Sequence, residues 1–346
     1  MASNHNISKP KVSVLMPVHN AAATIEAAIR SILDQDLKDF EFIIIDDGSA
    51  DSTARLIARW AEKDHRIHVF SQSQKGIIEA LNLGLTQCSA LLIARMDADD
   101  LAHKERLSKQ VAFIEQNPEL AVVGCMVEAF PADHVKKGYR IYIEWLNSLI
   151  TSEQISREIF IESPIVHPSA MIKRSWIDRV GGYQDHGWPE DYDLWLRLQM
   201  AGAKFAKVPE VLLAWRDYPE RFSRNDSRYS IENFLRAKAH YLSQGPLANR
   251  DAVFIWGAGQ MGRRISKHLL RNGTQLQAFL DINPKKIGRT LRGLPILALE
   301  DFPKLWHAAE NPALLAAVGS RGARALIRER LIDWNLEEGS DWWAVA

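Results

Sequence analysis

The stretch "FEFIIIDDGSADSTARLIARWAEK" (residues 40–63) carries the pattern that decides the fold. Residues 40–45 are an almost continuous apolar run, which predicts a buried strand. A polar turn containing Gly48 follows, and then apolar residues recur at helical spacing. The stretch therefore predicts one strand–turn–helix unit with an acidic turn at the end of the strand.

The same alternation continues on both sides of this stretch. "VSVLMPV" (12–18) predicts a strand, and residues 22–37 predict a helix with Thr24 as its N-cap. The strands and helix that come later are expected at residues 67–70, 76–88 and 90–96. Continuous Val/Ile/Leu strands that alternate with amphipathic helices indicate an α/β fold, with a mostly parallel sheet covered on both faces.

A second strand–helix–strand unit is predicted to begin near residue 252. Helices are expected near Pro189 and at 231–243, and "SQGPLANRD" (243–251) has the composition of a linker. At 346 residues the chain exceeds the usual size of a single core. We predict a first domain at 1–243, a linker at 244–250 and a smaller Rossmann-like domain at 251–346.

Composition narrows the class of protein. The chain has 43 basic and 43 acidic residues, so its formal net charge is zero, which argues weakly against a partner that is bulk nucleic acid or an anionic membrane. Cys88 and Cys125 are the only cysteines, which fits a reducing compartment. The N-terminus lacks the apolar segment of a signal peptide, and no apolar run reaches the roughly eighteen residues of a membrane span. We expect a cytoplasmic protein that is soluble or at most peripheral.

Carboxylates follow two of the predicted strands, as "DDGS" (46–49) and "DADD" (97–100). Ligands of parallel sheets bind beyond the carboxyl ends of strands, so these residues should converge on one crevice. Asp99, with Asp97 beside it and Asp100 in support, would suit Mg²⁺ or Mn²⁺ holding a nucleoside diphosphate. The alternative is that these acids cap the next helix. Asp47 could accept the N3 proton of uracil, or instead close an Asx turn.

Further candidates lie in the second half of the predicted first domain. Glu190 and Asp191 open a predicted helix, where a carboxylate could act as a general base or simply complement the helix dipole. Trp188 could stack on an acceptor, or be ordinary packing. His167 could line the acceptor side, or be a structural histidine.

These motifs, in their order along the chain, resemble family 2 glycosyltransferases with the GT-A fold. The resemblance covers about the first two-thirds of the sequence and rests on the following segments: "KVSVLMPVHNAAATIEAAIRSILDQ", "FEFIIIDDGSADST", "KGIIEALNLGL", "ARMDADDLAHKERLSKQ" and "PEDYDLWLRL". It implies an inverting enzyme that uses a nucleotide-sugar, here a UDP-sugar, and Mn²⁺ or Mg²⁺.

The resemblance also implies a role for individual residues. Asp47 would bind the nucleotide base. Pro17 and Val18 would line the same pocket, to which we also assign Gly76. Asp97 to Asp99 would be the DxD motif, with Asp99 on the metal, and Asp191 would be the catalytic base. Arg216 and Arg221 fall in a segment that often closes over the donor, where a guanidinium could meet the diphosphate; a solvated loop is the alternative.

The C-terminal part contains a dinucleotide-like fingerprint. Gly257, Gly259 and Gly262 follow a predicted strand, and Asp281 ends the next one. The glycines could bind a nucleotide such as NAD(H), or serve helix packing alone. Basic residues outnumber acidic ones between 258 and 292, which indicates either an anion-binding patch, RNA included, or a solvated helix.

Both domains together, with "IWGAGQMGRR" and "LEEGSDWWAVA", resemble the β-1,3-N-acetylglucosaminyltransferase-like proteins. That group is associated with galactosyl transfer to queuosine in tRNA. We therefore expect transfer of a galactose or N-acetylglucosamine type of hexose to a saccharide or to tRNA. The alternatives are a nucleotide-sugar-binding or regulatory protein, and an NAD-dependent oxidoreductase that works through the C-terminal domain.

Overall fold

The computed structural model describes residues 9–132, 135–218, 221–320 and 322–346, without the side chains of 222 and 223. Part of the N-terminal segment that argued against a signal peptide, and part of the segment expected to close over the donor, therefore lie outside the described residues. By compactness the chain divides into two units. Unit 1 comprises 1–152, 164–186 and 201–221, and unit 2 comprises 153–163, 187–200 and 222–346.

Unit 1 is built on an eight-stranded sheet in the order β3-β2-β1-β4-β7-β6-β8-β5. Strands β1 to β4 are mutually parallel, β7 runs antiparallel to both of its neighbours, and β6 and β8 are parallel to each other. The strands are β1 (Val12–Val18), β2 (Phe40–Asp47), β3 (Ile67–Gln72), β4 (Leu92–Arg95), β5 (Leu101–Ala102), β6 (Leu120–Phe130), β7 (Met171–Lys173) and β8 (Lys204–Arg216).

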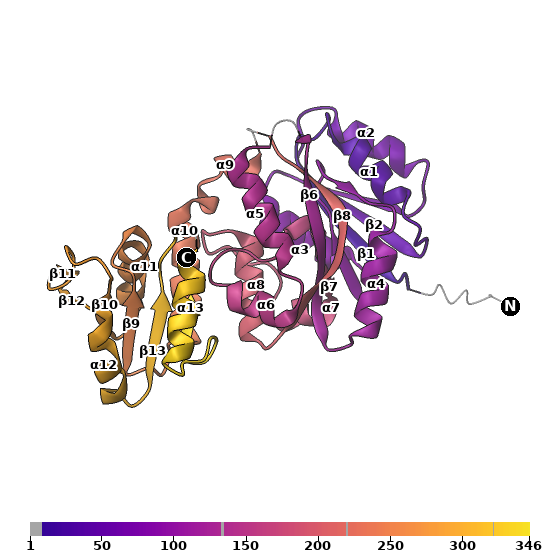
Figure 1. Ribbon diagram of the computed structural model, residues 1–346. Helices are drawn as coiled ribbons and strands as arrows, with labels where there is room; N and C mark the ends of the chain where they lie inside the picture. Colours follow the sequence, from indigo (N-terminus) through magenta and orange to yellow (C-terminus); the bar gives the residue numbers. More distant parts are fainter. Residues whose placement is uncertain (1–8, 133–134, 219–220, 321) are drawn as a thin grey trace. The chain divides into compact units, whose positions relative to one another are not determined.

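Helices pack against this sheet and close its core (Figure 1). They are α1 (Ile25–Leu33), α2 (Thr53–Ala61), α3 (Ile77–Gln87), α4 (Arg106–Gln116), α5 (Lys137–Ser148), the 3₁₀ turn η2 (His167–Ser169) and α7 (Arg174–Arg179). Helix α3 contacts β1 and β2, whereas α4 and α5 contact β6. The strands β1 and β2 are almost wholly buried, as a parallel sheet with helical cover requires.

Helix α1 is shorter than the predicted 22–37. The backbone N–H of Ala21 donates to Thr53 Oγ1 at 2.8 Å, and that of Ala22 donates to Asp51 at 3.1 Å. Side chains from the start of α2 and from the turn before it thus bind the backbone where the predicted helix would begin. Thr24 is the N-cap as predicted, but its side chain makes no capping hydrogen bond.

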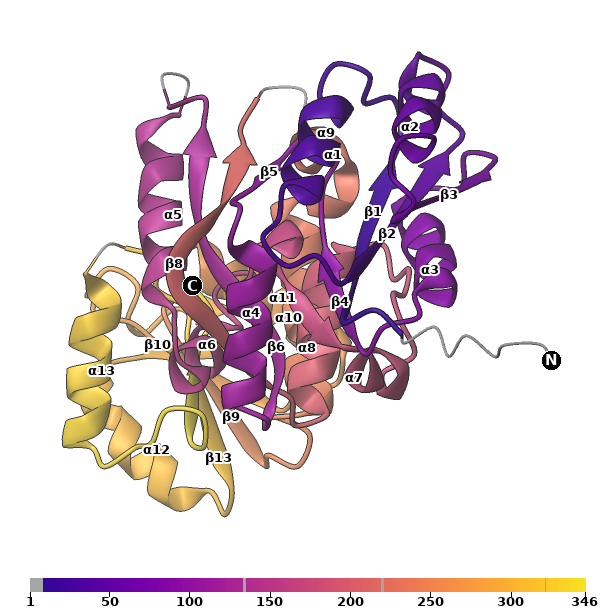
Figure 2. The same ribbon diagram turned by 90° about the vertical axis from the view of Figure 1, so that its right-hand side faces the viewer.

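Unit 2 carries the second sheet, in the order β11-β12-β10-β9-β13-β14. All its strands are parallel except β11. They are β9 (Ala252–Trp256), β10 (Leu276–Leu280), β11 (Thr290–Leu291), β12 (Leu294–Leu297), β13 (Pro312–Ala316) and β14 (Trp342–Ala344). Helix α11 (Gln260–Arg271) connects β9 to β10, which is the predicted Rossmann-like unit. Figure 2 shows the same elements from the side.

The remaining helices of unit 2 precede the first strand of that sheet or connect its later strands. They are α6 (Ser152–Glu158, whose first residue falls in unit 1), α8 (Glu190–Met200), α9 (Phe222–Asn225), η3 (Ser227–Tyr229), α10 (Ile231–Gln244), η4 (Leu299–Asp301), α12 (Phe302–Ala308) and α13 (Ala323–Asp333). Helix α10 packs on α8 and α11. By compactness, α6 and α8 thus group with the C-terminal sheet, and the division at 244–250 stays a prediction. Among the described residues, no helix is both long and apolar enough to cross a bilayer.

Candidate active site

Sheet order brings three of the predicted segments to one edge of unit 1. Strand β1 pairs with β2 on one side and β4 on the other, all parallel. Pro17 and Val18 end β1, Asp47 ends β2, and the "DADD" segment directly follows β4. Because neighbouring strands lie about 4.8 Å apart, β2 and β4 run about 10 Å apart on the two sides of β1. The sequence predicts that the nucleotide binds at this edge, which we call the donor edge.

Asp47 is a buried carboxylate held by donors from the β3–α3 loop. Its Oδ1 accepts from Gln72 Nε2 at 2.7 Å and from the Lys75 N–H at 2.8 Å, and its Oδ2 accepts from the Gly76 N–H at 2.8 Å. Burial raises the pKa of Asp47, but these hydrogen bonds outweigh burial and lower that pKa overall. The Asx-type bond of this turn comes from Asp46, which accepts from the Ser49 N–H at 3.2 Å. Asp47 is therefore an anionic acceptor rather than the turn-closing residue.

The carboxylates of Asp97, Asp99 and Asp100 form a tight acidic cluster. One oxygen from each lies within 4.8 Å of the others. The capping alternative is excluded, because α4 begins at Arg106 with Glu105 as its N-cap and no side-chain capping bond. The three carboxylates have no helix to cap and must be stabilised in another way.

Burial and mutual repulsion disfavour the ionised forms of this cluster. Burial, followed by the charge of Asp97, raises the pKa of Asp99. Burial raises the pKa of Asp100 further, with the charges of Asp97 and Asp99 adding to it. Asp100 is 1% exposed; its Oδ1 accepts from the Arg216 N–H at 2.8 Å, while its Oδ2 has no hydrogen-bond partner among the described residues. A buried carboxylate oxygen without a donor, beside two more carboxylates, fits a hard divalent cation.

Arginines support the cluster from neighbouring elements. Arg95 Nη1 forms an ion pair with Asp97 Oδ1 at 2.5 Å, and the fully buried Arg106 donates to the Arg95 carbonyl at 2.6 Å. Arg216 Nε donates to the Asp99 carbonyl at 2.6 Å. The predicted diphosphate residue Arg216 is thus held against the main chain of the cluster. Sequence reasoning missed Arg95 and Arg106, although a basic residue on the buried face of α4 is a detectable signal.

The segment after β8 also faces the cluster. The Tyr218 hydroxyl donates to Asp99 Oδ2 at 3.0 Å, a contact that the sequence did not predict. The charge of Arg221 acts on all three carboxylates. Its guanidinium lies 4.0 Å from the centre of the Trp215 ring and donates to the Tyr139 hydroxyl at 2.9 Å. Arg221 is therefore part of the electrostatic surroundings of the cluster, and its contact with a diphosphate stays a prediction.

The predicted catalytic pair lies in unit 2, at the start of α8. Glu190 is 1% exposed, and both of its carboxylate oxygens accept from the Tyr229 hydroxyl, at 2.9 and 2.7 Å. Asp191 is partly exposed, and its Oδ1 accepts from the Tyr192 N–H at 2.7 Å. Burial of Glu190 leaves Asp191 as the more accessible of the two carboxylates, which agrees with the role predicted for it. That role, and its relation to the donor edge in unit 1, stay predictions.

The two predicted acceptor residues are buried and hydrogen-bonded. Trp188 is 7% exposed, and its indole N–H donates to Asp193 Oδ1 at 2.8 Å, which also accepts from the Tyr241 hydroxyl at 2.6 Å. His167 Nε2 lies 2.8 Å from the Tyr183 hydroxyl, and burial, helped by the charge of Arg95, lowers its pKa well below the usual value. Both have the structural role that was their alternative, and contact with an acceptor stays a prediction.

The fingerprint of the second sheet has a structural purpose that is visible in its geometry. Gly257 has φ +117°, and a Cβ on Gly262 would lie 1.8 Å from the Gly257 carbonyl oxygen. Asp281 Oδ2 accepts from the Ala258 N–H at 3.0 Å and from Lys286 Nζ at 2.8 Å. Asp281 thus binds the glycine loop after β9 and the loop that follows its own strand. A Cβ on Gly259, by contrast, would meet nothing within 4 Å.

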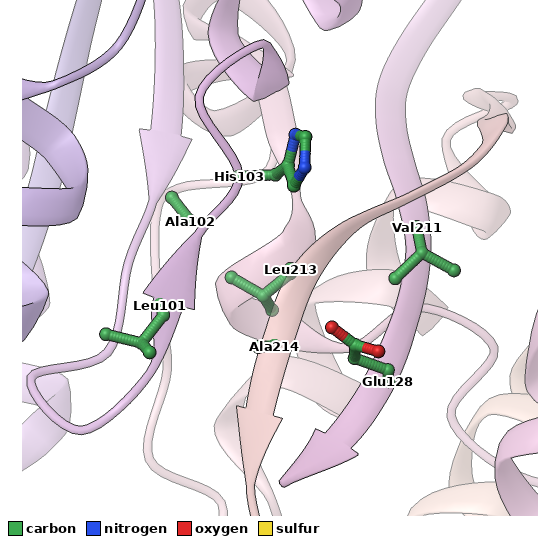
Figure 3. Close-up of a pocket in the computed structure, with 7 residues that line it drawn as sticks. All are labelled: Leu101, Ala102, His103, Glu128, Val211, Leu213 and Ala214. Carbon is green, nitrogen blue, oxygen red and sulfur yellow. The ribbon is translucent and has the colours of Figure 1, made fainter.

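One small pocket lies in unit 1, and none of the site residues described above lines it. It has a volume of about 120 Å³ and is formed by β5, β6 and β8 (Figure 3). Its lining residues are Leu101, Ala102, His103, Glu128, Val211, Leu213 and Ala214. Pockets for organic ligands usually start near 300 Å³, so this hollow is too small for a nucleotide-sugar.

Comparison with known proteins finds a family for each of two parts of the chain. Residues 13–181 match the family "Glycosyl transferase family 2", and residues 249–329 match "CoA binding domain". The chain is 33% identical over 233 residues to the "Putative glycosyltransferase EpsE" of Bacillus subtilis (strain 168), which covers 66% of this chain and 81% of that protein.

Two further proteins extend the comparison. The "UDP-Gal:alpha-D-GlcNAc-diphosphoundecaprenol beta-1,3-galactosyltransferase" of Escherichia coli is 28% identical over 248 residues, which is 70% of this chain and 88% of that protein. Among solved structures, S. aureus TarS 1-349 in complex with UDP-GlcNAc superposes with a TM-score of 0.56 at 17% identity, over 75% of this chain and 72% of that one. That likeness concerns the fold.

Proposed function

Because the chain belongs to glycosyl transferase family 2, and therefore transfers sugar from a nucleotide-sugar, we propose that its donor is a UDP-hexose and its acceptor the hydroxyl group of a saccharide. The sugar in this proposal is galactose or N-acetylglucosamine. The observation that carries the proposal is the acidic cluster at the donor edge of unit 1, with its unpartnered Asp100 oxygen.

In this proposal Asp99 and Asp97 would hold a divalent cation, Mn²⁺ or Mg²⁺, with Asp100 in support. When bound, the cation would neutralise negative charge on the departing diphosphate. The Asp47 carboxylate accepts a hydrogen bond from the N3–H of uracil, and Pro17, Val18 and Gly76 line the base pocket. The preference for a uracil nucleotide rests on that acceptor, since its lowered pKa keeps it ionised at neutral pH.

The chemistry of the proposal is a single inverting displacement. Asp191 accepts the proton of the acceptor hydroxyl, whose oxygen bonds to the anomeric carbon as the bond from that carbon to the diphosphate oxygen breaks. Glu190 positions the start of α8 through its two hydrogen bonds with Tyr229. Both carboxylates are therefore needed, but only Asp191 moves a proton.

A saccharide acceptor is favoured over tRNA by the Escherichia coli relative, whose name gives a GlcNAc-diphosphoundecaprenol acceptor. We also place the protein in the cytoplasm. Burial raises the pKa of the free thiols Cys88 and Cys125 to about 12 and about 11, so both stay protonated and unreactive. Unpaired thiols fit a reducing compartment.

The test compares wild type, Asp99→Asn and Asp191→Asn by thermal shift and turnover. UDP should raise the melting temperature of wild type only with Mn²⁺, and GDP, CMP and NAD⁺ should not, because binding to the native state stabilises it. Asp99→Asn should lose that shift. Asp191→Asn should keep it while turnover falls about 10²- to 10⁴-fold, which is the usual contribution of a general base.

The outcomes separate the parts of the proposal. Undiminished turnover in Asp191→Asn would show that Asp191 is not the base. A rise in melting temperature with UDP that does not require Mn²⁺ would show that the cation is not needed for donor binding. A shift with NAD⁺ alone would make the second sheet the main nucleotide site. Transfer to tRNA, with no transfer to GlcNAc-terminated saccharides, would replace the acceptor.

A further inference from the structure

Unit 2 carries a group of cations without carboxylate partners, which we call the basic patch. Its six members are Arg263, Arg264 and Arg271 from α11, and Lys285, Arg289 and Arg292 from the segment between β10 and β12. Lys267 and Lys286 of the same stretch form ion pairs with Glu232 at 2.6 Å and Asp281 at 2.8 Å. None of the six forms an ion pair within the described part of the chain, and Asp281 is the only acidic residue between 258 and 292.

Contacts between the two segments make the patch one surface. Arg292 Nη2 donates to the Arg263 carbonyl at 2.8 Å, and Arg292 Nε donates to Ser266 Oγ at 3.1 Å. These bonds hold the β11–β12 hairpin against the first turns of α11. Arg264 and Arg271 are seven residues apart on a helix, so they lie along the same face. The patch thus extends from the hairpin along α11.

Two exposed aliphatic side chains accompany these cations. Ile282 is 74% exposed, directly before the loop of Lys285, and Leu270 is 38% exposed, beside Arg271. A single exposed aliphatic residue needs no explanation, but one that projects from a cluster of unpaired cations does. The only aromatic residue from 258 to 292 is Phe279, which is fully buried. The part of the surface formed by residues 258–292 therefore offers no aromatic ring on which a nucleic-acid base could stack.

We propose that the basic patch binds the surface of an anionic lipid membrane, with Ile282 entering the headgroup region. Cations close to such a surface are attracted to its negative potential, and an inserted aliphatic side chain supplies the second, apolar part of the binding energy. The proposal does not depend on the donor chemistry of unit 1. Its consequence is that the enzyme works next to acceptors that are anchored in the same membrane.

The experiment is co-sedimentation of the full chain with vesicles of phosphatidylcholine alone and of phosphatidylcholine with phosphatidylglycerol. We expect binding to the anionic vesicles only, weakening as salt is added. The double variant Lys285→Gln/Arg289→Gln should bind at least about tenfold more weakly, since each basic residue near the surface contributes about fivefold. Ile282→Ser should bind about tenfold more weakly through lost apolar burial.

Matched controls come from another face of unit 2. Lys304→Gln/Arg330→Gln removes two exposed cations of α12 and α13, and Ile332→Ser removes an aliphatic side chain that is 68% exposed on α13. These variants should bind anionic vesicles like wild type. All variants should keep the wild-type melting temperature and turnover on a water-soluble acceptor.

Three results would overturn the proposal. They are absence of binding to phosphatidylglycerol vesicles, equal losses in the patch and control variants, and binding to tRNA that is abolished by Lys285→Gln/Arg289→Gln while vesicles are ignored. The last result would make the patch a nucleic-acid surface. Each can occur whether or not the donor is a UDP-sugar, so failure here is distinct from failure of the proposed function.

Discussion

Among the three clustered aspartates, Asp100 is the one whose ionised form is most destabilised by burial and by its neighbours. Its pKa is raised on folding, so the folded chain binds more protons than the unfolded chain. The free energy of unfolding therefore falls as pH rises from the ordinary aspartate value of 3.8 through the raised one. Without metal at pH 7, we expect Asp100→Asn to be more stable than wild type in urea, and the difference to disappear toward pH 3.8 and below.

The control for this experiment is an aspartate whose pKa is lowered, rather than raised, on folding. The pKa of Asp64 is lowered by its hydrogen bonds with Arg66, so Asp64→Asn should lose stability at pH 7. Mn²⁺ should stabilise wild type more than Asp100→Asn, because the variant keeps Asp99 and Asp97 but loses the supporting carboxylate. If Asp100→Asn were less stable than wild type at pH 7 in EDTA, the Asp100 anion would be a net stabilising group.

Gly259 and Gly262, at the start of α11, belong to the same glycine fingerprint, but the space around them differs. A Cβ on Gly262 would collide with the Gly257 carbonyl oxygen at 1.8 Å, whereas one on Gly259 would meet nothing within 4 Å. We expect Gly262→Ala to reduce the free energy of unfolding by about 2 kcal/mol or more, as overpacking does. Gly259→Ala should change that free energy by less than about 0.5 kcal/mol.

Urea unfolding of the two variants measures this difference directly. Equal stability of Gly262→Ala and Gly259→Ala would mean that the loop yields to the added methyl group. If a ligand approaches the loop at Gly259, Gly259→Ala should weaken its binding without unfolding the chain. The pair therefore separates the packing role of the fingerprint from a binding role, which the fingerprint alone leaves open.

At the element scale, the features that depend on neighbouring residues were predicted correctly. The features that depend on residues far away in the sequence were not. The strand at 12–18 has its predicted bounds, and the acidic residues lie at strand ends as expected, because both follow from neighbouring residues. The start of α1 was placed too early, since Thr53 and Asp51 bind the backbone where the predicted helix would begin. Without the family resemblance, Glu190 and Asp191 could not be distinguished, because the burial of Glu190 involves Tyr229, 39 residues away.

At the scale of the whole molecule, the chain passes repeatedly between its two compact units. Glu158 is 6% exposed and pairs with Arg324 at 2.8 Å and Arg328 at 2.5 Å, all within unit 2. A fragment of residues 1–243 would keep this carboxylate and lose both partners. Removing the partners of a buried ion pair costs about 3–5 kcal/mol, so we expect the fragment to melt without a cooperative transition.

Circular dichroism of the fragment and the full chain tests this expectation. Glu158→Gln in the fragment should recover part of the lost structure, because the amide removes the charge. A cooperative transition in the unmodified fragment, at the temperature of the full chain, would support an independent domain that ends at 243. The predicted linker would then also be a boundary of folding.

The pairing of Glu158 with Arg324 has a consequence for how a cell makes this protein. The two residues are 166 positions apart, so at ribosomal speed roughly ten to thirty seconds separate their emergence. During that interval α6 and α8 have left the ribosome while the helix that neutralises Glu158 has not been synthesised. We expect this window to be the point at which nascent chains need chaperones, and slowed translation after α8 to lower the yield of native enzyme.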